Sequence, residues 1–227
     1  MSSPLLHSAL IPTRNVQQDF YDWDKRHQQK LAQAQSGNHD LVFIGDSITH
    51  LFEVEDRGLP VWERYYGHRH ALDLGYGWDC TQNVLWRFEN GEFAGQQPKL
   101  VVLNIGTNNL TGNDACPANT AEEIVEGIAA ICGVVQQTSP QTTILSMAIF
   151  PRSLTPDPVH AKAKLVNTLL ARHLRRKPGI LHLNIGERFL GPDGEIPCEL
   201  MDDRCHPTQQ GYGIWAEAIE PVVRHYL

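Results

Sequence analysis

The chain alternates short, nearly continuous apolar runs with longer segments in which apolar residues recur every three or four positions. The short runs have the length and β-branched content of strands, and they occupy residues 41–45, 70–77, 99–106, 142–151 and 179–186. The run at 99–106, KLVVLNIG, is apolar at almost every position, which is typical of a strand covered on both faces. The pattern therefore predicts five strands.

The longer segments predict helices over residues 16–35, 81–91, 120–140, 160–177 and 208–227. In the first of these, one helix face collects Phe20, Trp23, His27 and Leu31. The third opens with a capping pattern, Thr120 followed by Glu123, before its apolar stripe begins. Strands that alternate with helices of this length are joined by right-handed crossovers, so we expect a parallel sheet between two layers of helices.

A chain of 227 residues fits one such α/β/α domain, with residues 1–37 as a helical extension packed on it. Ligands bind outside the carboxyl ends of the strands in parallel sheets of this kind. Three polar loops, at residues 45–47, 75–78 and 106–109, directly follow predicted strands. We therefore expect the three loops to meet at one edge of the sheet.

Composition narrows the classes of partner. The net charge of −7 and the sequence pI near 5.8 argue against nucleic acid, which requires an excess of cations. No run approaches the roughly 20 apolar residues of a membrane span, and residues 1–15 lack the basic and apolar regions of a secretory signal. The five cysteines are odd in number and without framework spacing, so we expect free thiols and a cytoplasmic location.

Two polar clusters suggest nucleophilic chemistry when they are taken together. A Gly45-Asp46-Ser47 turn is by itself typical of a helix cap. Asp203 and His206, however, lie three residues apart just before the last helix, which lets the carboxylate accept the Nδ1–H of the imidazole. The Nε2 atom of His206 is then free to act as the base that a serine nucleophile such as Ser47 needs.

A serine nucleophile also needs donors that stabilise the oxyanion of a tetrahedral intermediate. The candidates are the backbone N–H of Ser47, a backbone N–H from the second loop at Gly77 or Trp78, and the side-chain amide of Asn108. Asp46, Ile48, Thr107 and Arg152 are further candidates for contact with the substrate, although for Arg152 a structural ion pair is the favoured interpretation. A metal site at Asp202, Cys198, Cys205 and His206 lacks the paired cysteine spacing of such sites.

The blocks FIGDSIT, the second glycine loop, GTNN and DRCHP resemble the four signature blocks of the SGNH (GDSL-type) serine hydrolases. From about Asp40 onward the chain is also similar to the catalytic subunits of intracellular platelet-activating-factor acetylhydrolase and their bacterial relatives. The resemblance implies a flavodoxin-like domain that hydrolyses esters of small acyl groups without a metal or other cofactor. By position, Ser47 matches the nucleophile, Asn108 the oxyanion amide, and Asp203 and His206 the rest of the triad.

The chain departs from this family's pattern at two places. It has Gly77-Trp78-Asp79 where relatives usually have Gly-Gly-Asp, and Asp73 where they often have asparagine, which adds a carboxylate near the site. A tryptophan backbone N–H can serve as the oxyanion donor if its φ is negative, whereas a positive φ favours Gly77 as the donor. We expect His50 and His160 to be surface or loop residues, and Trp86 and Phe88 to belong to the core.

The sequence thus favours a serine esterase that removes acetyl or other short acyl groups from carbohydrates or other small molecules. A phospholipid acetylhydrolase, a longer-acyl lipase and a thioesterase stay open, because the length of the acyl pocket is not readable from the residues. A binding module for an anion or nucleotide would need a G-x-G-x-x-G loop or a P-loop lysine, and both are missing. An inactive relative that acts as a scaffold subunit is a further alternative. Because related subunits pair, a homodimer is a possible oligomeric state.

Overall fold

The computed structural model describes residues 6–17, 19–114, 116–153 and 157–227. The first five residues of the segment inspected for a secretory signal, and one residue of the predicted first helix, lie outside this part.

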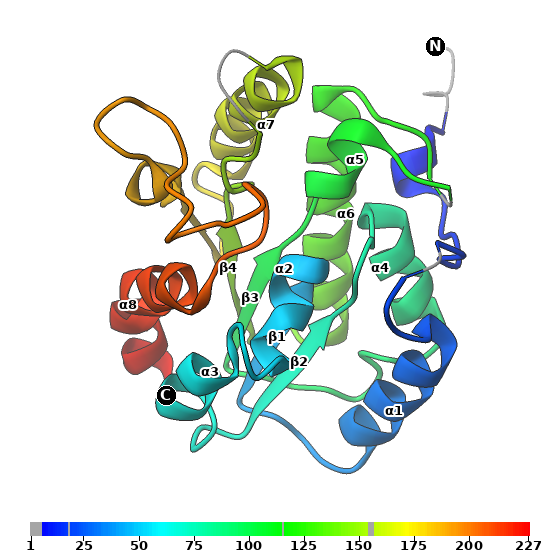
Figure 1. Ribbon diagram of the computed structural model, residues 1–227. Helices are drawn as coiled ribbons and strands as arrows, with labels where there is room; N and C mark the ends of the chain where they lie inside the picture. Colours follow the sequence, from blue (N-terminus) through cyan, green and yellow to red (C-terminus); the bar gives the residue numbers. More distant parts are fainter. Residues whose placement is uncertain (1–5, 18, 115, 154–156) are drawn as a thin grey trace.

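The predicted parallel sheet is present and has five strands in the order β2-β1-β3-β4-β5 (Figure 1). This order is that of flavodoxin-like folds. The strands are β1 (Leu41–Gly45), β2 (Ala71–Gly75), β3 (Leu100–Asn104), β4 (Thr143–Met147) and β5 (Ile180–Leu183).

Helices cover both faces of the sheet, as the alternation predicts. One face is covered by α1 (Trp23–Gln35), α4 (Thr81–Glu89), α6 (Ala121–Thr138) and α7 (Pro158–Leu174), and the other by α3 (Leu59–Tyr65) and α8 (Gln209–Tyr226). Two short helices, α2 (Ser47–His50) and α5 (Thr107–Thr111), begin just beyond strand ends, and 3-10 turns lie at η1 (Ser8–Leu10), η2 (Leu51–Glu53) and η3 (Gly186–Phe189).

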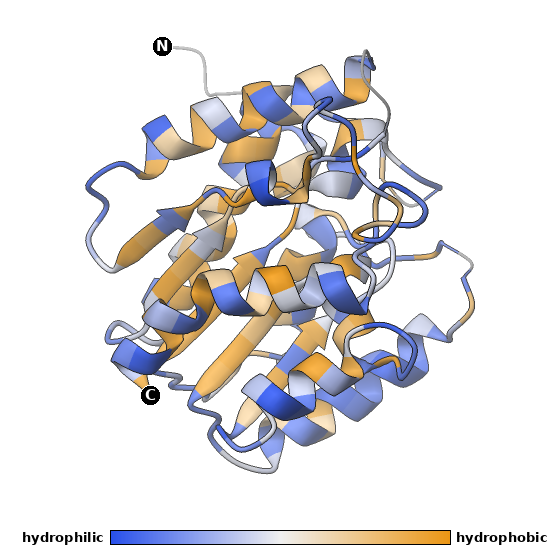
Figure 2. Cartoon of the chain, turned by 60° about the vertical axis from the view of Figure 1, so that its left-hand side comes forward, coloured by the Kyte–Doolittle hydropathy of each residue, from blue (hydrophilic) through white to orange (hydrophobic). Residues whose placement is uncertain are grey.

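Strands β1 to β4 bury both of their faces along almost their whole length, which explains the continuous apolar runs, whereas the edge strand β5 is partly exposed at Leu181. Val42 and Ile44 of β1 pack in one hydrophobic cluster with α4, α6 and α7, whereas Leu41 and Phe43 pack in the opposite cluster with Trp215 of α8. Figure 2 shows the strands as a hydrophobic layer between helices whose outer turns are hydrophilic. Burying a side chain of this size contributes about 1.5–3 kcal/mol, so the sheet is stabilised from both sides.

The first helix starts later than its pattern predicts. Asp22 has an extended backbone and its side chain accepts the N–H of Lys25, so α1 begins at Trp23 and not near residue 16. Phe20, which the spacing placed on the helix face, therefore lies outside the helix with 68% of its surface exposed. Phe88 is in the core as expected, and Trp86 is half-buried against Trp23.

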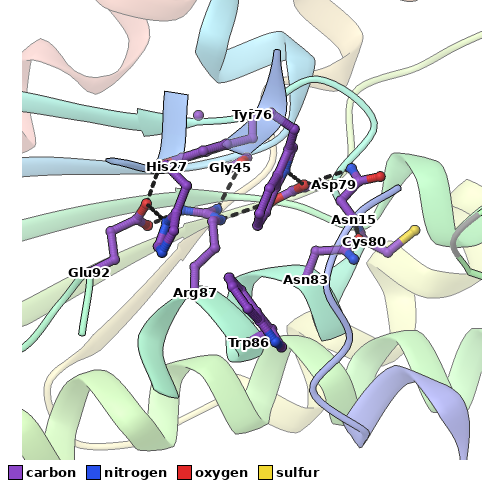
Figure 3. A network of polar contacts seen from close by, with 12 residues as sticks. Asn15, His27, Gly45, Tyr76, Asp79, Cys80, Asn83, Trp86, Arg87 and Glu92 are labelled. Carbon is purple, nitrogen blue, oxygen red and sulfur yellow. Dashed lines mark hydrogen bonds and ion pairs between the residues drawn. The ribbon is translucent and has the colours of Figure 1, made fainter. Parts of the chain in front are cut away.

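The fully buried Arg87 lies at the centre of a polar cluster that includes the loop after β2 (Figure 3). The Nε of Arg87 donates to Asp79 at 2.9 Å, and its Nη1 donates to Glu92, which also accepts the hydroxyl of Tyr76. Trp23 of α1 donates its indole N–H to the other oxygen of Asp79 at 2.8 Å. These bonds tie the N-terminal segment, the second loop and α4 into one polar cluster inside the protein.

Two carboxylates, those of Asp79 and Glu92, share this one guanidinium, and their pKa values shift in opposite directions. Burial raises the pKa of Asp79 to about 6, although Arg87 opposes the shift. Burial also opposes the charge of Glu92, but Arg87 together with the hydrogen bonds from His27 and Tyr76 outweighs it, so that the pKa of Glu92 is lower than usual. The guanidinium carbon lies 4.0 Å from the centre of the Tyr76 ring, which adds a cation–π contact.

We expect Arg87→Met to destabilise the fold by ~3–5 kcal/mol at pH 7, because Asp79 and Glu92 would lose their buried counter-charge. Urea unfolding measures the free energy of unfolding of each protein. The loss of stability in Arg87→Met should be smaller at pH 5, since carboxylates without a partner take up protons as the pH falls. Arg172→Met on the exposed side of α7 is the matched control, expected within about 0.5 kcal/mol of the parent. Equal stability of the two variants would contradict this account of the cluster.

Candidate active site

The strand register brings the three predicted loops to one edge of the sheet. Gly45 at the end of β1 pairs with Gly75 at the end of β2 and with Asn104 at the end of β3, so the three strands end level. A Cβ atom on Gly75 would lie 2.2 Å from the backbone nitrogen of His50. Glycine is therefore required at the end of β2 if α2 is to pack directly on it.

Ser47 is the first residue of α2, and its side chain reaches the loop before α8. Asp46 caps α2 through its Oδ1, which accepts the N–H of Ile48 at 3.0 Å. The Oγ of Ser47 lies 2.8 Å from the Nε2 of His206, although the two residues are 159 positions apart along the chain. The crossover from β1 and the loop before α8 thus bring together the hydroxyl and imidazole that the sequence singled out.

The loop before α8 holds His206 through Asp203. The Nδ1 of His206 lies 2.6 Å from Asp203 Oδ2, while Asp203 Oδ1 accepts the backbone N–H groups of Cys205 and His206. Burial opposes the charge of Asp203, but these hydrogen bonds and His206 hold its pKa well below the ordinary range. An ionised Asp203 accepts the Nδ1–H, which leaves Nε2 as the acceptor for the Ser47 hydroxyl.

Asn108 reaches the same edge from α5. Its Nδ2 donates to the backbone carbonyl of Asp79 at 3.0 Å, and the residue is buried. A primary amide carries two N–H donors. One N–H of Asn108 is therefore held by the second loop, and the other is available to the cavity that the side chain lines.

The second loop has a positive φ at Trp78, although we expected a bulky residue that serves as an oxyanion donor to have a negative φ. Trp78 itself has a left-handed backbone, with φ of 65°, and its carbonyl accepts the side-chain amide of Asn113. Gly77 donates its N–H to His50 Nδ1 at 3.3 Å, so this N–H is already used. A Cβ at position 77 would lie 2.7 Å from Asp19 Oδ2 and 2.8 Å from the ring of Tyr21, so a larger residue there would displace both side chains.

His50 and His160 are buried, so their predicted surface positions were wrong. Burial, helped by Arg26 and Lys30, lowers the pKa of His50 to about 2, and its neutral ring accepts the N–H of Gly77. His160 lies on α7 with its Nδ1 3.4 Å from the carbonyl of Arg152. The burial of His50 was missed because α2 is only one turn long and shows no periodic pattern, whereas His160 lies on the long helix α7.

A cavity of about 320 Å³ opens at Ser47. Its lining residues are Asp19, Phe20, Ser47, Leu51, Arg57, Trp78, Asn108, Arg152, Cys205 and His206. Asp19, Phe20, Leu51 and Arg57 were not predicted, because they follow no strand end and belong to no motif. Only the tertiary structure brings the segment before α1 and the segment after α2 to the cavity.

Three of the four further residues that we considered as substrate contacts do not line this cavity. Asp46 is fully buried as the cap of α2, and Ile48 belongs to the hydrophobic cluster beneath it. Thr107 is buried and accepts a hydrogen bond from Arg152 through its hydroxyl at 3.2 Å. Arg152 alone of the four reaches the cavity.

The alternative metal ligands form no metal site in the described part of the chain. The extra carboxylate of Asp73 does not line the cavity. Across the described ranges, no cluster of three or more histidine, cysteine or acidic residues could hold a metal ion. Asp202 instead pairs with Arg57, and Cys198 is an exposed free thiol. Asp73 is buried in β2, where it accepts the N–H of Gly75 and lies near Arg26.

The chain belongs to the GDSL-like lipase/acylhydrolase family, whose model matches residues 43–214, and it is a carboxylic ester hydrolase. The binding-module and scaffold alternatives are therefore set aside. The α1 subunit of platelet-activating factor acetylhydrolase IB from Bos taurus is 34% identical over 220 residues, which cover 97% of this chain and 90% of the subunit. The human α2 subunit is 32% identical over 205 residues, covering 90% and 85%.

Solved structures share the fold at lower identity. A GDSL-like lipase from Bacteroides thetaiotaomicron has a TM-score of 0.72 at 19% identity, covering 89% of this chain and 98% of the lipase. An acetylxylan esterase from Geobacillus stearothermophilus has a TM-score of 0.61 at 18% identity, covering 81% and 93%. Within the described ranges, no helix combines the length and the apolar character that crossing a bilayer requires.

Asp46→Asn should make stability less sensitive to pH. Burial raises the pKa of Asp46 to about 7, above its ordinary value near 4, so the folded state holds a proton that the unfolded chain releases. Stability is therefore lost as the pH rises from about 4 to 7. Asparagine keeps the cap acceptor without the charge. The free energy of unfolding of the variant, relative to that of the parent, should therefore rise by about 1 kcal/mol or more from pH 5 to pH 8.

Urea unfolding at both pH values checks this, with Asp56→Asn as a control that removes the same charge from an exposed position. A parallel pH dependence in the parent and in Asp46→Asn would show that folding does not raise the pKa of this carboxyl.

Proposed function

We propose that this enzyme is a serine esterase that hydrolyses short acyl esters, acetyl esters above all, of carbohydrates or other small molecules. Ser47 is the nucleophile, His206 the general base and Asp203 the residue that orients it. The observation that carries the proposal is the 2.8 Å approach of Ser47 Oγ to an imidazole whose other nitrogen lies 2.6 Å from a carboxylate.

The reaction would proceed through an acyl-enzyme. Ser47 Oγ attacks the ester carbonyl carbon and passes its proton to His206 Nε2, while Asp203 stabilises the imidazolium. The bond to the alcohol oxygen breaks, and His206 protonates the leaving alkoxide. Water then attacks the acyl-enzyme, gives its proton to His206, and releases the carboxylic acid as the proton returns to Ser47.

Three donors would stabilise the oxyanion, each worth about 10²–10³ in rate. These are the backbone N–H of Ser47 at the start of α2, the second amide N–H of Asn108, and the backbone N–H of Trp78. We choose Trp78 over Gly77 because the Gly77 N–H is donated to His50, whereas Trp78 lines the cavity. The hydrogen bond from Asn113 to the Trp78 carbonyl supports its left-handed backbone.

The cavity favours a small acyl group. Its volume of about 320 Å³ is at the lower end for ligand sites, and Trp78, Phe20 and Leu51 form apolar walls. Burial raises the pKa of Cys205 to about 11, so the nearby thiol stays protonated and does not compete with Ser47. The names of the relatives point the same way, since they include acetylhydrolase subunits and an acetylxylan esterase.

Ser47→Ala should abolish both labelling by an organophosphonate and hydrolysis of 4-nitrophenyl acetate, with a fall in kcat of roughly 10⁴-fold or more. Mass spectrometry locates the label and absorbance follows the hydrolysis. Ser36→Ala, at the exposed C-cap of α1, is the matched control and should keep both properties. Hydrolysis retained in Ser47→Ala would remove the mechanism.

A series from 4-nitrophenyl acetate through butyrate to octanoate should show kcat/KM falling by about tenfold or more, with acetylated sugars tested beside it. Trp78→Gly keeps the backbone donor but removes the wall, so it should accept octanoate better relative to acetate. A parent enzyme that prefers octanoate would support a lipase or thioesterase and would reject the small-acyl proposal without affecting Ser47.

A further inference from the structure

Arg152 brings a cation to the cavity, and none of the described residues is an acidic partner for it. It follows β4, and its Nη1 donates to the backbone carbonyl of Thr107 at 3.1 Å and to the Thr107 hydroxyl at 3.2 Å. Both acceptors are neutral, and among the described residues no carboxylate forms an ion pair with Arg152. Its Nε is buried without a hydrogen-bond partner, so the protein satisfies this guanidinium only in part.

Arg57, the other arginine of the cavity, shows what a compensated cation looks like here. Its Nη1 lies 2.7 Å from a carboxylate oxygen of Asp202. The hydrogen bond to Asp202 raises the pKa of Arg57 further above its usual value. The charge of Arg57 is therefore neutralised by its neighbour, whereas Arg152 forms no such ion pair within the described part of the chain.

The strand order separates the remaining charges of the cavity. Asp19 lies beside Gly77, at the loop that follows β2. Arg152 lies beyond β4, and the order β2-β1-β3-β4 places Ser47, which follows β1, between the two. An ester bound at Ser47 thus meets an acidic side chain in one direction and an unpaired guanidinium in the other.

We propose that Arg152 binds an anionic group of the substrate, so that the preferred esters carry a carboxylate or a phosphate in addition to the acyl bond that is cleaved. The inference rests on the proposed esterase function of Ser47. A guanidinium is planar and always charged, and it recognises carboxylate and phosphate oxygens with directed donors. Arg152 is a specificity-determining residue in this proposal and takes no part in the proton transfers.

Matched pairs of esters test where and whether an anion is recognised. The pair 4-acetoxybenzoate and 4-acetoxybenzamide places the charge on the alcohol side, mono-4-nitrophenyl succinate and its neutral amide place it on the acyl side, and 4-acetoxyphenyl phosphate tests phosphate. Each kcat/KM is divided by the rate with hydroxide alone to remove intrinsic reactivity. We expect at least one anionic ester to be preferred over its neutral partner by about tenfold or more.

Arg152→Met should lower kcat/KM for the preferred anionic ester by about 10- to 100-fold, mainly through KM, with a much smaller change for the neutral partner. Arg152→Lys should keep part of the preference, and added salt should weaken it. Arg172→Met removes the same charge from the exposed side of α7 and should leave the preference unchanged.

Two results would overturn the inference. One is a parent enzyme without any preference for the anionic esters. The other is an equal loss on both members of a pair in Arg152→Met, which would mean that Arg152 only positions Thr107 and, next to it, Asn108. Activity retained in Ser47→Ala would instead refute the proposed function, so the two failures are distinguishable.

Discussion

The geometry at the carboxyl ends of the strands depends on the ion pairs that the buried guanidinium of Arg87 forms. The guanidinium binds Asp79 and Glu92 directly, and its Nη2 lies 3.5 Å from the carbonyl of Gly45, the residue before the turn that carries Ser47. The backbone carbonyl of Asp79 in turn holds the amide of Asn108. A continuous set of polar contacts therefore runs from a charge in the interior to two walls of the cavity. A buried charge of this kind is costly unless it is fully paired, and that requirement keeps the loop after β2 in one arrangement.

Exclusion of water gives chemically similar groups opposite properties around the site. Asp203 is partly exposed and accepts three hydrogen bonds, so it stays ionised beside the imidazole. Asp46 lies only one residue from Ser47 but is fully buried, and its second carboxylate oxygen has no partner, so its pKa rises. His50 is held neutral by burial and acts as an acceptor for the second loop. The protonation state of each group follows from its surroundings and could not be assigned from its residue type.

The predictions succeeded where local pattern and strand topology decide the outcome. The five strands and the parallel sheet follow from apolar runs that alternate with helices, and the level strand ends follow from parallel pairing. Asp203 and His206 are close because only two residues separate them in one loop. The predictions failed where a side chain's direction depends on contacts distant in sequence. Ile48 and Thr107 adjoin the residues of the site but point into the core or toward Arg152.

The sequence alone determined the order of elements, the α/β class and the presence of a serine, a histidine and a carboxylate in positions that a sheet edge could bring together. These properties depend on periodicity and on short spacings, which the chain carries locally. The tertiary structure decided that Phe20 and Asp19 leave the expected helix to wall the cavity, and that Trp78, not Gly77, adopts the left-handed backbone. It also left Arg152 without an ion-pair partner among the residues that the structure describes. These outcomes depend on which side chains fill the space around each loop, and that space exists only once the sheet and both helix layers have packed.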